Sequence, residues 1–423
     1  MVSMQQPARP RLFRMPVRDL TAGDFAAYAS MSSGAFGGSY DPTAPGAPRD
    51  FSPGQTPLGI DASSVPGGLD GVLAAGARIR HDRVALGGGV VGCGGIAGLA
   101  VHPAHRGDGL FGQLLTAVIA RCDAEGLPLS MLYPSNPAIY RRFGYQVVAR
   151  TESLIVPLVD LQRLRPVPDR RLVPVTEQTM PRLRELYHRL SAHENAMLRR
   201  EAPLFEEGLP GGGWSALLLE DLSGTAHGYL SWTRLNGADG VGLEVHEVLG
   251  RTRADRVALL RSLGSWSTVT EHVRLRLRPE DPLLDALPGG GARPDPRPVP
   301  LVMMRVVDTV GALRARPAPP SLTGAVRLVV EDSTVPPGTC RAAGTFVVSA
   351  ADRRVEAAPE EGEDRALLGT IRLDIHAASL LLVGGRSLAD ARRLDLTATA
   401  DPAAETFLDA LLAGPRPGVL DAF

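Results

Sequence analysis

The sequence predicts several α/β and α+β domains in tandem, and three observations lead to this prediction. The chain has 423 residues, which is more than one hydrophobic core usually accommodates. Short strand-like apolar runs alternate with runs that have helical spacing. Two Pro- and Arg-rich segments, 163–171 and 289–300, interrupt this pattern as domain boundaries do. We therefore expect domains at 1–166, 167–299 and 300–423.

The first domain is expected to be an α/β unit. Its centre is a helix over 109–125, in which apolar residues from Leu110 to Cys122 recur on one face. The stretch 37–66 is rich in Gly, Pro, Ser and Asp and is predicted to be a long loop or a lid. The other expected elements are a helix over 24–36, two short strands within 84–101, a strand over 129–133, a short helix over 137–143 and a strand region over 146–157.

The uncharged run 84–101 invites two other interpretations. Its 18 residues reach the lower limit for a membrane-spanning helix, but seven of them are Gly, which disfavours a helix. Gly87, Gly89 and Gly92 also form a literal GxGxxG. A dinucleotide-binding motif must open a helix, whereas another strand-like run follows here. We therefore expect neither a membrane span nor a dinucleotide site.

The second domain is predicted to be another α/β-like unit, and the third contains both strands and helices. The elements expected in the second are a helix over 179–199, strands over 215–220 and 228–235, and a helix over 253–266. Those expected in the third are strands over 325–330 and 344–349 and helices over 387–394 and 403–412.

Composition limits the class of protein. The net charge is −1, so the chain offers no overall basic field for nucleic acid. Cys93, Cys122 and Cys340 are widely spaced and form no CxxC, which argues against disulfides and a structural zinc site and favours the cytoplasm. The first 20 residues contain no apolar core, so no secretory signal is expected.

The run 98–115, GLAVHPAHRGDGLFGQLL, contains the residues with the clearest chemistry. A strand ends near Val101, Pro103 stops it, and a tight Gly-rich loop opens the helix. Such a loop presents unpaired backbone N–H groups at the positive end of a helix dipole. Glycine lets the backbone approach a phosphate closely, and Arg106 adds a positive charge. We expect this loop to bind a pyrophosphate.

This run resembles the acyl-CoA loop of the GNAT superfamily of N-acyltransferases, which reads V-x-P-x-x-R-G-x-G before a helix. The matching residues are Val101, Pro103, Arg106, Gly107 and Gly109. The segments 135–140 (SNPAIY) and 142–145 (RFGY), with an aromatic last residue, narrow the resemblance to the Eis-like (enhanced intracellular survival) acetyltransferases. The resemblance implies two tandem GNAT-type domains, the second degenerate, then a sterol-carrier-like α+β domain, and a hexameric assembly.

The resemblance also implies acetyl-CoA as the co-substrate and assigns roles to residues. Tyr140 would be the general acid that protonates the departing CoA thiolate, and the carboxylate of Phe423 would be the base for the amine. The residues implied to hold the cofactor are Leu99, Ala100, Val101, Arg106, Gly107, Asp108, Gly109, Leu110, Phe111, Gly112, Ser135 and Asn136. The segment 249–255 of the second domain lacks the second Gly of the loop, so we expect no cofactor there.

Physical chemistry suits Tyr140 better than Phe423 to these roles. A phenol with a pKa of about 10 can protonate a thiolate with a pKa of roughly 8.5. A free α-carboxyl with a pKa of about 3.5 is a weak base unless it is desolvated or acts through a water. The alternatives are that Tyr140 packs under the 142–145 turn and that Phe423 ends a mobile tail. We expect His102 and His105 in supporting or surface positions.

Departures from the family pattern bear on the ligand. Phe111 stands where many GNAT loops have a third Gly. Asp108 places a negative charge in a phosphate loop, so its side chain must point outward. Ala422 precedes the terminal Phe, and the run 32–36 brings no carboxylate. We therefore expect a less acidic pocket than in the aminoglycoside-modifying relatives.

The leading hypothesis is an acetyl-CoA-dependent N-acetyltransferase for a primary amine on an aminoglycoside-like molecule, a polyamine, a peptide or a Lys side chain. The alternatives are a non-catalytic acyl-CoA- or lipid-binding protein and a biosynthetic acyltransferase with a longer acyl donor. No metal is expected, because the two His-Glu pairs, at 193–194 and 246–247, never extend to HExxH.

All 45 positive side chains are Arg, and the chain contains no Lys. Codon bias explains this most simply, because Gly, Pro, Ala and Arg are enriched together. An amine-acetylating enzyme of this composition has no side-chain target in its own chain. After incubation with acetyl-CoA we expect at most one N-acetyl group, on the N-terminal amine; a mass spectrum with several would contradict this.

Overall fold

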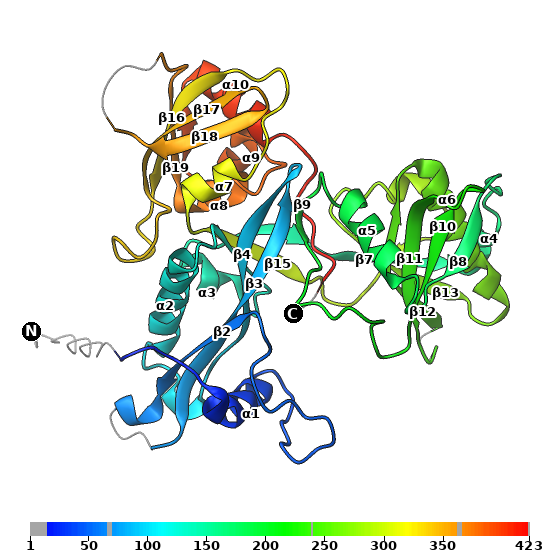
Figure 1. Ribbon diagram of the computed structural model, residues 1–423, viewed down its shortest axis with the longest axis horizontal. Helices are drawn as coiled ribbons and strands as arrows, with labels where there is room; N and C mark the ends of the chain where they lie inside the picture. The colour runs from blue at the N-terminus through cyan, green and yellow to red at the C-terminus, as the bar shows by residue number, and fades with distance from the viewer. Residues whose placement is uncertain (1–14, 66–69, 238–239, 362–365, 422–423) are drawn as a thin grey trace, which may run out of the picture.

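The computed structural model describes residues 15–65, 70–237, 240–361 and 366–421. Three lobes meet near the C-terminal end of the chain (Figure 1). Each lobe is built on one mixed sheet, in which one pair of neighbouring strands is parallel and the other pairs are antiparallel.

The first sheet has the order β1-β2-β3-β4-β5-β15-β6, and β9 also pairs with β3. The uncharged run 84–101 forms the end of β3, a turn at Gly87 and Gly88, whose φ values are +59° and +102°, and β4, so the predicted pair of strands joined by a Gly-rich turn is present. Strand β3 begins at Leu73, so it is longer than predicted. The strands of this sheet are β1 (Arg18–Asp19), β2 (Gln55–Asp61), β3 (Leu73–Leu86), β4 (Gly89–Val101), β5 (Leu129–Leu132), β6 (Gln146–Arg150), β9 (Asn195–Leu198) and β15 (Leu301–Val306). Its helices are η1 (Ala22–Asp24), α1 (Phe25–Ala35), η2 (Ala62–Ser64), η3 (Pro103–His105), α2 (Leu110–Ala124) and α3 (Pro137–Arg141).

Helices α1 and α2 cover opposite faces of this sheet. Ala75 and Ala77 of β3 belong to the same buried cluster as the apolar face of α2. Between them, Gly76 lies against α1, and a Cβ there would be 2.8 Å from the ring of Tyr28. Because successive residues of a strand face opposite sides of the sheet, the two helices enclose it.

The second sheet has the order β14-β7-β13-β12-β11-β10-β8. It repeats a unit of the first lobe, because β12 and β13 are parallel and joined through α6, as β4 and β5 are joined through α2. Its strands are β7 (Glu152–Pro157), β8 (Arg171–Pro174), β10 (Trp214–Glu220), β11 (Ala226–Arg234), β12 (Val241–Gly250), β13 (His272–Leu277) and β14 (Arg293–Pro294). Its helices are α4 (Leu158–Gln162), α5 (Met180–Leu190), α6 (Arg253–Leu263), η4 (Gly264–Thr268) and η5 (Leu284–Ala286).

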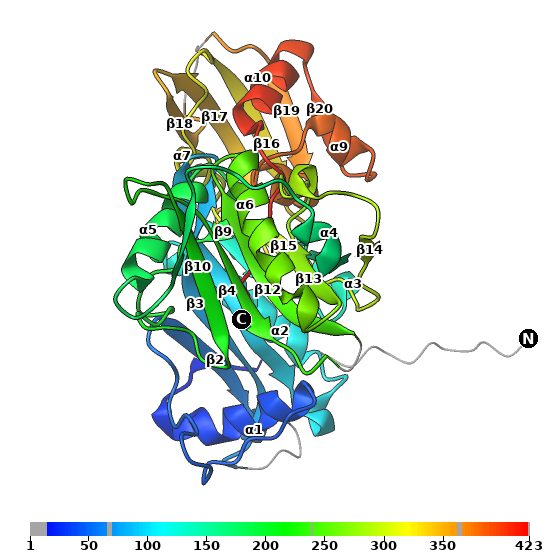
Figure 2. The same ribbon diagram turned by 90° about the vertical axis from the view of Figure 1, so that its right-hand side faces the viewer.

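The third lobe is an α+β unit with the sheet order β18-β17-β16-β19-β20 (Figure 2). Its strands are β16 (Gly324–Glu331), β17 (Gly344–Ala351), β18 (Arg354–Pro359), β19 (Thr370–Asp374) and β20 (Ala398–Ala400). Its helices are α7 (Thr309–Arg314), α8 (Ile375–Leu381), α9 (Leu388–Arg392) and α10 (Pro402–Leu412).

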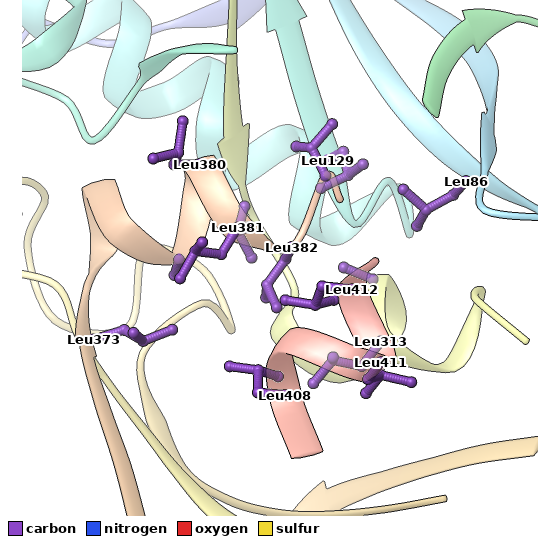
Figure 3. Close-up of a cluster of buried hydrophobic side chains, with 14 of the residues drawn as sticks. Leu86, Leu129, Leu313, Leu373, Leu380, Leu381, Leu382, Leu408, Leu411 and Leu412 are labelled. Carbon is purple, nitrogen blue, oxygen red and sulfur yellow. The ribbon is translucent and has the colours of Figure 1, made fainter. Parts of the chain in front are cut away.

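The first and third lobes share one hydrophobic core. Leu86 and Leu129 of the first sheet lie beside Leu382 and Leu412 of the third lobe (Figure 3). All four side chains are at most 1% exposed. Since burial of one leucine contributes about 1.5–3 kcal/mol, this shared core binds the two lobes tightly together.

The sheets do not follow the predicted domain boundaries. Strand β7 precedes residue 166 but pairs with β13 of the second sheet. Strand β15, at the start of the predicted third domain, lies between β5 and β6 of the first sheet. Five of its six residues are buried, as expected of a strand that is covered on both faces.

Two local expectations were also wrong. The stretch 37–66 is not loop throughout, because β2 occupies 55–61 and pairs with β3. The predicted helix over 179–199 ends at Leu190, and Asn195–Leu198 forms β9 instead. In both cases pairing with the long strand β3 overrides the local pattern.

Candidate active site

The site begins with an irregularity in strand β4. Gly76 pairs with Ala100, but the next pair joins Arg78 to Ala97, so β4 bulges at Gly98 and Leu99. The φ of Gly98 is +57°, in the left-handed region that favours glycine. The bulge lies just beyond Gly95, the last residue of β4 that pairs with β5.

The gap between β4 and β5 exposes main-chain groups. The parallel pairing of the two strands ends at Gly95 and Met131. Beyond this point the edge of β4, as far as Val101, lines open space instead of a neighbouring strand. Its N–H and C=O groups need partners, and the amides of an extended ligand such as pantetheine would provide them.

The loop between β4 and α2 presents further N–H groups. Gly107 and Gly109 have φ values of +100° and +78°, and Gly109 caps α2 without a side-chain hydrogen bond. The N–H groups of the first helical turn therefore have no intrahelical acceptor and lie at the positive end of the helix dipole. A Cβ on Gly107 would meet nothing within 4 Å, so a phosphate has room to approach the loop.

These elements line a cleft of about 1770 Å³, well above the range of roughly 300–1,000 Å³ for an ordinary small-molecule pocket. It extends from the end of α1 past the loop and along the outer face of α2. A long ligand with a pyrophosphate in its middle, as in a CoA thioester, fits this shape and its donors.

Tyr140 lies where this cleft meets a second, smaller cavity. The tyrosine is 7% exposed, and the rings of Phe111 and Tyr145 pack edge-on against it at 5.5 Å and 6.2 Å. Burial raises the pKa of Tyr140, and a hydrogen bond with Ser135 partly opposes this. The phenol therefore keeps its proton at neutral pH and can donate it.

The short helix α3 holds Tyr140 in place. The side chain of Asn136 accepts a hydrogen bond from the N–H of Ala138 at 3.0 Å and caps the helix. Pro137 occupies its first turn, where its fixed φ is suitable and its missing N–H costs nothing.

Two segments of the chain match family models described as acetyltransferase (GNAT) domains, at 16–148 and at 196–306. The N-acetyltransferases Eis of Mycobacterium tuberculosis and Mycobacterium bovis are 26% identical to it over 334 residues, covering 74% of this chain and 79% of each relative. The chain is an Eis-like GNAT acetyltransferase.

Solved structures share its fold. A GCN5-related N-acetyltransferase from Anabaena variabilis superimposes with a TM-score of 0.80 at 20% identity, over 97% of this chain and 100% of that one. One from Kribbella flavida gives 0.76 at 24% identity, over 97% and 98%, and Eis1 of Mycobacterium abscessus gives 0.68 at 19%, over 97% and 100%. The predicted fold class of two tandem GNAT domains and an α+β domain is confirmed.

GNAT acetyltransferases use acetyl-CoA, and most residues predicted to hold it line the cleft. The predicted residues in its wall are Leu99, Ala100, Val101, Arg106, Gly107, Gly109, Leu110, Phe111, Gly112, Ser135 and Tyr140. Asp108 is not in the wall, and its carboxylate lies 3.6 Å from His105. Asn136 caps α3 rather than lining the cleft, and Phe423 lies outside the described residues.

The tail of this GNAT protein runs between the first two lobes toward the site. The hydroxyl of Thr151 donates a hydrogen bond of 3.0 Å to the carbonyl of Val419. Arg276 donates one of 2.8 Å to the carbonyl of Leu420, and the hydroxyl of Tyr133 donates to the carbonyl of Asp421. Since Tyr133 also lines the smaller cavity, the last described residue lies next to it.

The sequence did not reveal several residues of the site. Pro336–Thr339 of the third lobe and Met15–Val17 form walls of the cofactor cleft, and Tyr133 lines the smaller cavity. Only the Pro-Pro-Gly turn at 336–338 carries a local signal, and that signal does not say where the turn lies in space.

The second GNAT domain differs at the equivalent helix start. Thr252 accepts a hydrogen bond from the N–H of Asp255, and the Asp255 carboxylate accepts one of 3.0 Å from the N–H of Thr252. Arg170 also pairs with Asp255 at 2.9 Å. The start of α6 is thus closed by a capping box, whereas α2 starts at a glycine that has no side-chain cap.

Across the described ranges of the chain, no group of three or more His, Cys, Asp and Glu side chains is arranged to hold a metal ion. In those same ranges, no helix is long and apolar enough to cross a membrane.

Proposed function

We propose that this enzyme transfers the acetyl group of acetyl-CoA directly to a primary amine, with Tyr140 as the general acid and the carboxylate of Phe423 as the base. The observation that carries the proposal is the position of Tyr140, buried at the junction of the long cleft and the smaller cavity. Bound acetyl-CoA supplies a thioester whose carbonyl carbon accepts the amine.

The atoms balance without a covalent enzyme intermediate. The amine nitrogen forms a bond to the carbonyl carbon, and the bond from that carbon to sulfur breaks. The proton lost by the amine passes to the base, while Tyr140 gives its proton to the leaving sulfur. The main chain of Leu99–Val101 would orient the pantetheine, and the N–H groups of 106–112 with Arg106 would hold the pyrophosphate.

The course of the tail supports the role of Phe423. Phe423 follows Asp421 by two positions, so its Cα can lie at most about 7 Å from that of Asp421. Asp421 accepts a hydrogen bond from Tyr133, which lines the cavity beside Tyr140. A carboxylate delivered there would be desolvated, which raises its pKa and improves it as a base.

The test is the release of thiol from acetyl-CoA in the presence of amines. We expect Tyr140→Phe, and removal of Phe423, each to lower kcat about 10²–10⁴-fold, while the Kd for CoA in calorimetry stays within about twofold. Tyr145→Phe is the matched control, because it removes a neighbouring buried phenol hydroxyl that bonds Ser130 at 2.7 Å. Full activity in both test variants would overturn the assignment.

The same measurements decide between the alternatives. A non-catalytic acyl-CoA-binding protein would bind CoA without turning over any amine. An acyltransferase with a longer donor would prefer hexanoyl-CoA to acetyl-CoA.

We also propose a cytoplasmic hexamer with a sterol-carrier-like third domain, and light scattering in solution tests the hexamer.

A further inference from the structure

The smaller cavity is placed to receive the acceptor. Its volume is about 350 Å³, and it shares Phe36, Leu99, Ser135 and Tyr140 with the cofactor cleft. It lies where β4 and β5 part, so a molecule inside it would contact the end of a donor that reaches Tyr140. On the basis of the proposed function, we propose that this cavity binds a monoamine with an apolar or aromatic body, in preference to a polyamine.

The walls of the cavity lack the groups that ammonium ions need. Its lining residues are Phe36, Ile96, Ala97, Gly98, Leu99, Leu132, Tyr133, Pro134, Ser135 and Tyr140, none of which is acidic. Apart from main-chain groups, they offer hydroxyls and apolar surface. Transfer of an apolar body from water into this cavity is favourable in free energy. Each additional ammonium group would instead lose its hydration without finding a charged partner in the wall.

Two carboxylates close to Tyr133 of the cavity wall have arginine partners. Asp82 is 2% exposed and pairs with Arg80 at 3.0 Å. Asp421 pairs with Arg200 at 2.9 Å. Arg200 keeps Glu247 as a second partner, but using either carboxylate for a ligand would still weaken an existing ion pair that is largely shielded from water.

An arginine also lies behind the wall of the cavity. The Nε of Arg78 donates a hydrogen bond of 3.2 Å to the hydroxyl of Tyr28, which itself donates to the carbonyl of Gly98 in the cavity wall. This guanidinium repels a polycation in the cavity. The carboxylate of Phe423, in its proposed position, can pair with one ammonium group, and a monoamine has only one.

The experiment compares acceptors by kcat/KM with acetyl-CoA fixed at saturation. The probes are 2-phenylethylamine for the monoamine and spermidine and kanamycin for the polyamines. We expect 2-phenylethylamine to exceed both by at least about tenfold, since tenfold corresponds to a small difference in binding free energy. A higher kcat/KM for either polyamine would overturn the inference and leave the acetyltransferase function intact.

A matched pair of variants tests the physical cause. Phe36 is 62% exposed at the mouth of both cavities, so its replacement does not disturb the core. Phe36→Glu adds a carboxylate and should shift the ratio of kcat/KM values about tenfold toward spermidine, while the uncharged Phe36→Gln should not. Equal shifts in the two variants would show that charge is not the cause and overturn the inference.

Two further results distinguish a failure of this inference from a failure of the proposed function. If hexanoyl-CoA is preferred and excludes 2-phenylethylamine competitively, the cavity holds an acyl chain and the inference fails. If no amine releases thiol although CoA binds in calorimetry, the proposed function itself fails.

Discussion

The Nε atom of Arg200 lies 2.9 Å from Oδ1 of Asp421, and through this pair the second GNAT domain holds the end of the described chain. Arg200 also pairs with Glu247 of β12, and its guanidinium lies 4.1 Å from the centre of the Tyr187 ring. The second domain, in which a capping box that contains Asp255 closes the start of α6, thus anchors the tail. The tail in turn runs toward the candidate site of the first domain.

This anchoring predicts that Arg200 acts through the tail. If the Phe423 carboxylate has its proposed role, Arg200→Met should lower kcat at least about tenfold with an unchanged KM for acetyl-CoA, because displacing the proposed base slows the reaction without disturbing the cofactor. In a chain that lacks residues 422–423, the same substitution should lower kcat no further. Arg83→Met, which breaks an exposed pair with Glu201, is the control. Equal losses in both backgrounds would contradict the prediction.

The two carboxylates that share Arg200 should respond oppositely to pH. Burial raises the pKa of Asp421, with a further contribution from Glu247. A carboxyl with a raised folded pKa adds stability below its unfolded pKa of about 3.9, and that stability is lost as pH rises through the folded pKa. Asp421→Asn should therefore leave the free energy of unfolding unchanged or higher at pH 8.

Glu247 is predicted to behave the other way. Although its burial is unfavourable to the charge, Arg200 and the Tyr229 hydroxyl lower its pKa. Its stabilising contribution is present above an unfolded pKa of about 4.3 and is lost as pH falls through the folded pKa. Glu247→Gln should cost on the order of 3 kcal/mol at pH 8, and less at pH 4. Denaturant titrations at both pH values test this, and equal losses at both would contradict it.

The bulge of β4 depends on the absence of a side chain at Gly98. A Cβ there would lie 2.1 Å from the Tyr28 hydroxyl oxygen, so Gly98→Ala should move the β4 edge and raise the Kd for CoA about tenfold. Adding Tyr28→Phe removes the nearest of the clashing atoms and should restore part of the affinity. Gly34→Ala is the control, because a Cβ there would meet nothing within 4 Å. Calorimetry measures all four proteins, and unchanged affinity in Gly98→Ala would refute the prediction.

A buried arginine joins the first and third lobes. Arg305 of β15 is fully buried and pairs with Asp332 at 2.5 Å, and it donates to the carbonyl of Phe143 and to the Thr334 hydroxyl. Arg305→Met leaves Asp332 buried without its cation and should cost about 3–5 kcal/mol. Combining it with Asp332→Leu should recover part of the loss in a denaturant titration. A double variant less stable than Arg305→Met would contradict this account.

Local patterns predicted the elements whose signals are short-range. The one-face spacing from Leu110 to Cys122 predicted α2, and Arg106–Gly109 predicted an open loop before it; the structure has both. Long-range pairing was not predictable from local patterns. The residues of β9 have the pattern of a helix, but they pair with β3. The residues of β15 follow a domain-boundary signal, but they pair with β5 of the first sheet. The wall at Pro336–Thr339 was missed for the same reason.

Because β15 (Leu301–Val306) lies between β5 and β6, the sheet of the first lobe is complete only after residues far along the chain have been synthesised. A fragment that ends at residue 166 would lack this central strand and would expose two unpaired edges, which invite aggregation. Limited proteolysis between the lobes should therefore leave a nicked but associated complex. The cofactor cleft can form only after more than two-thirds of the polypeptide has been made.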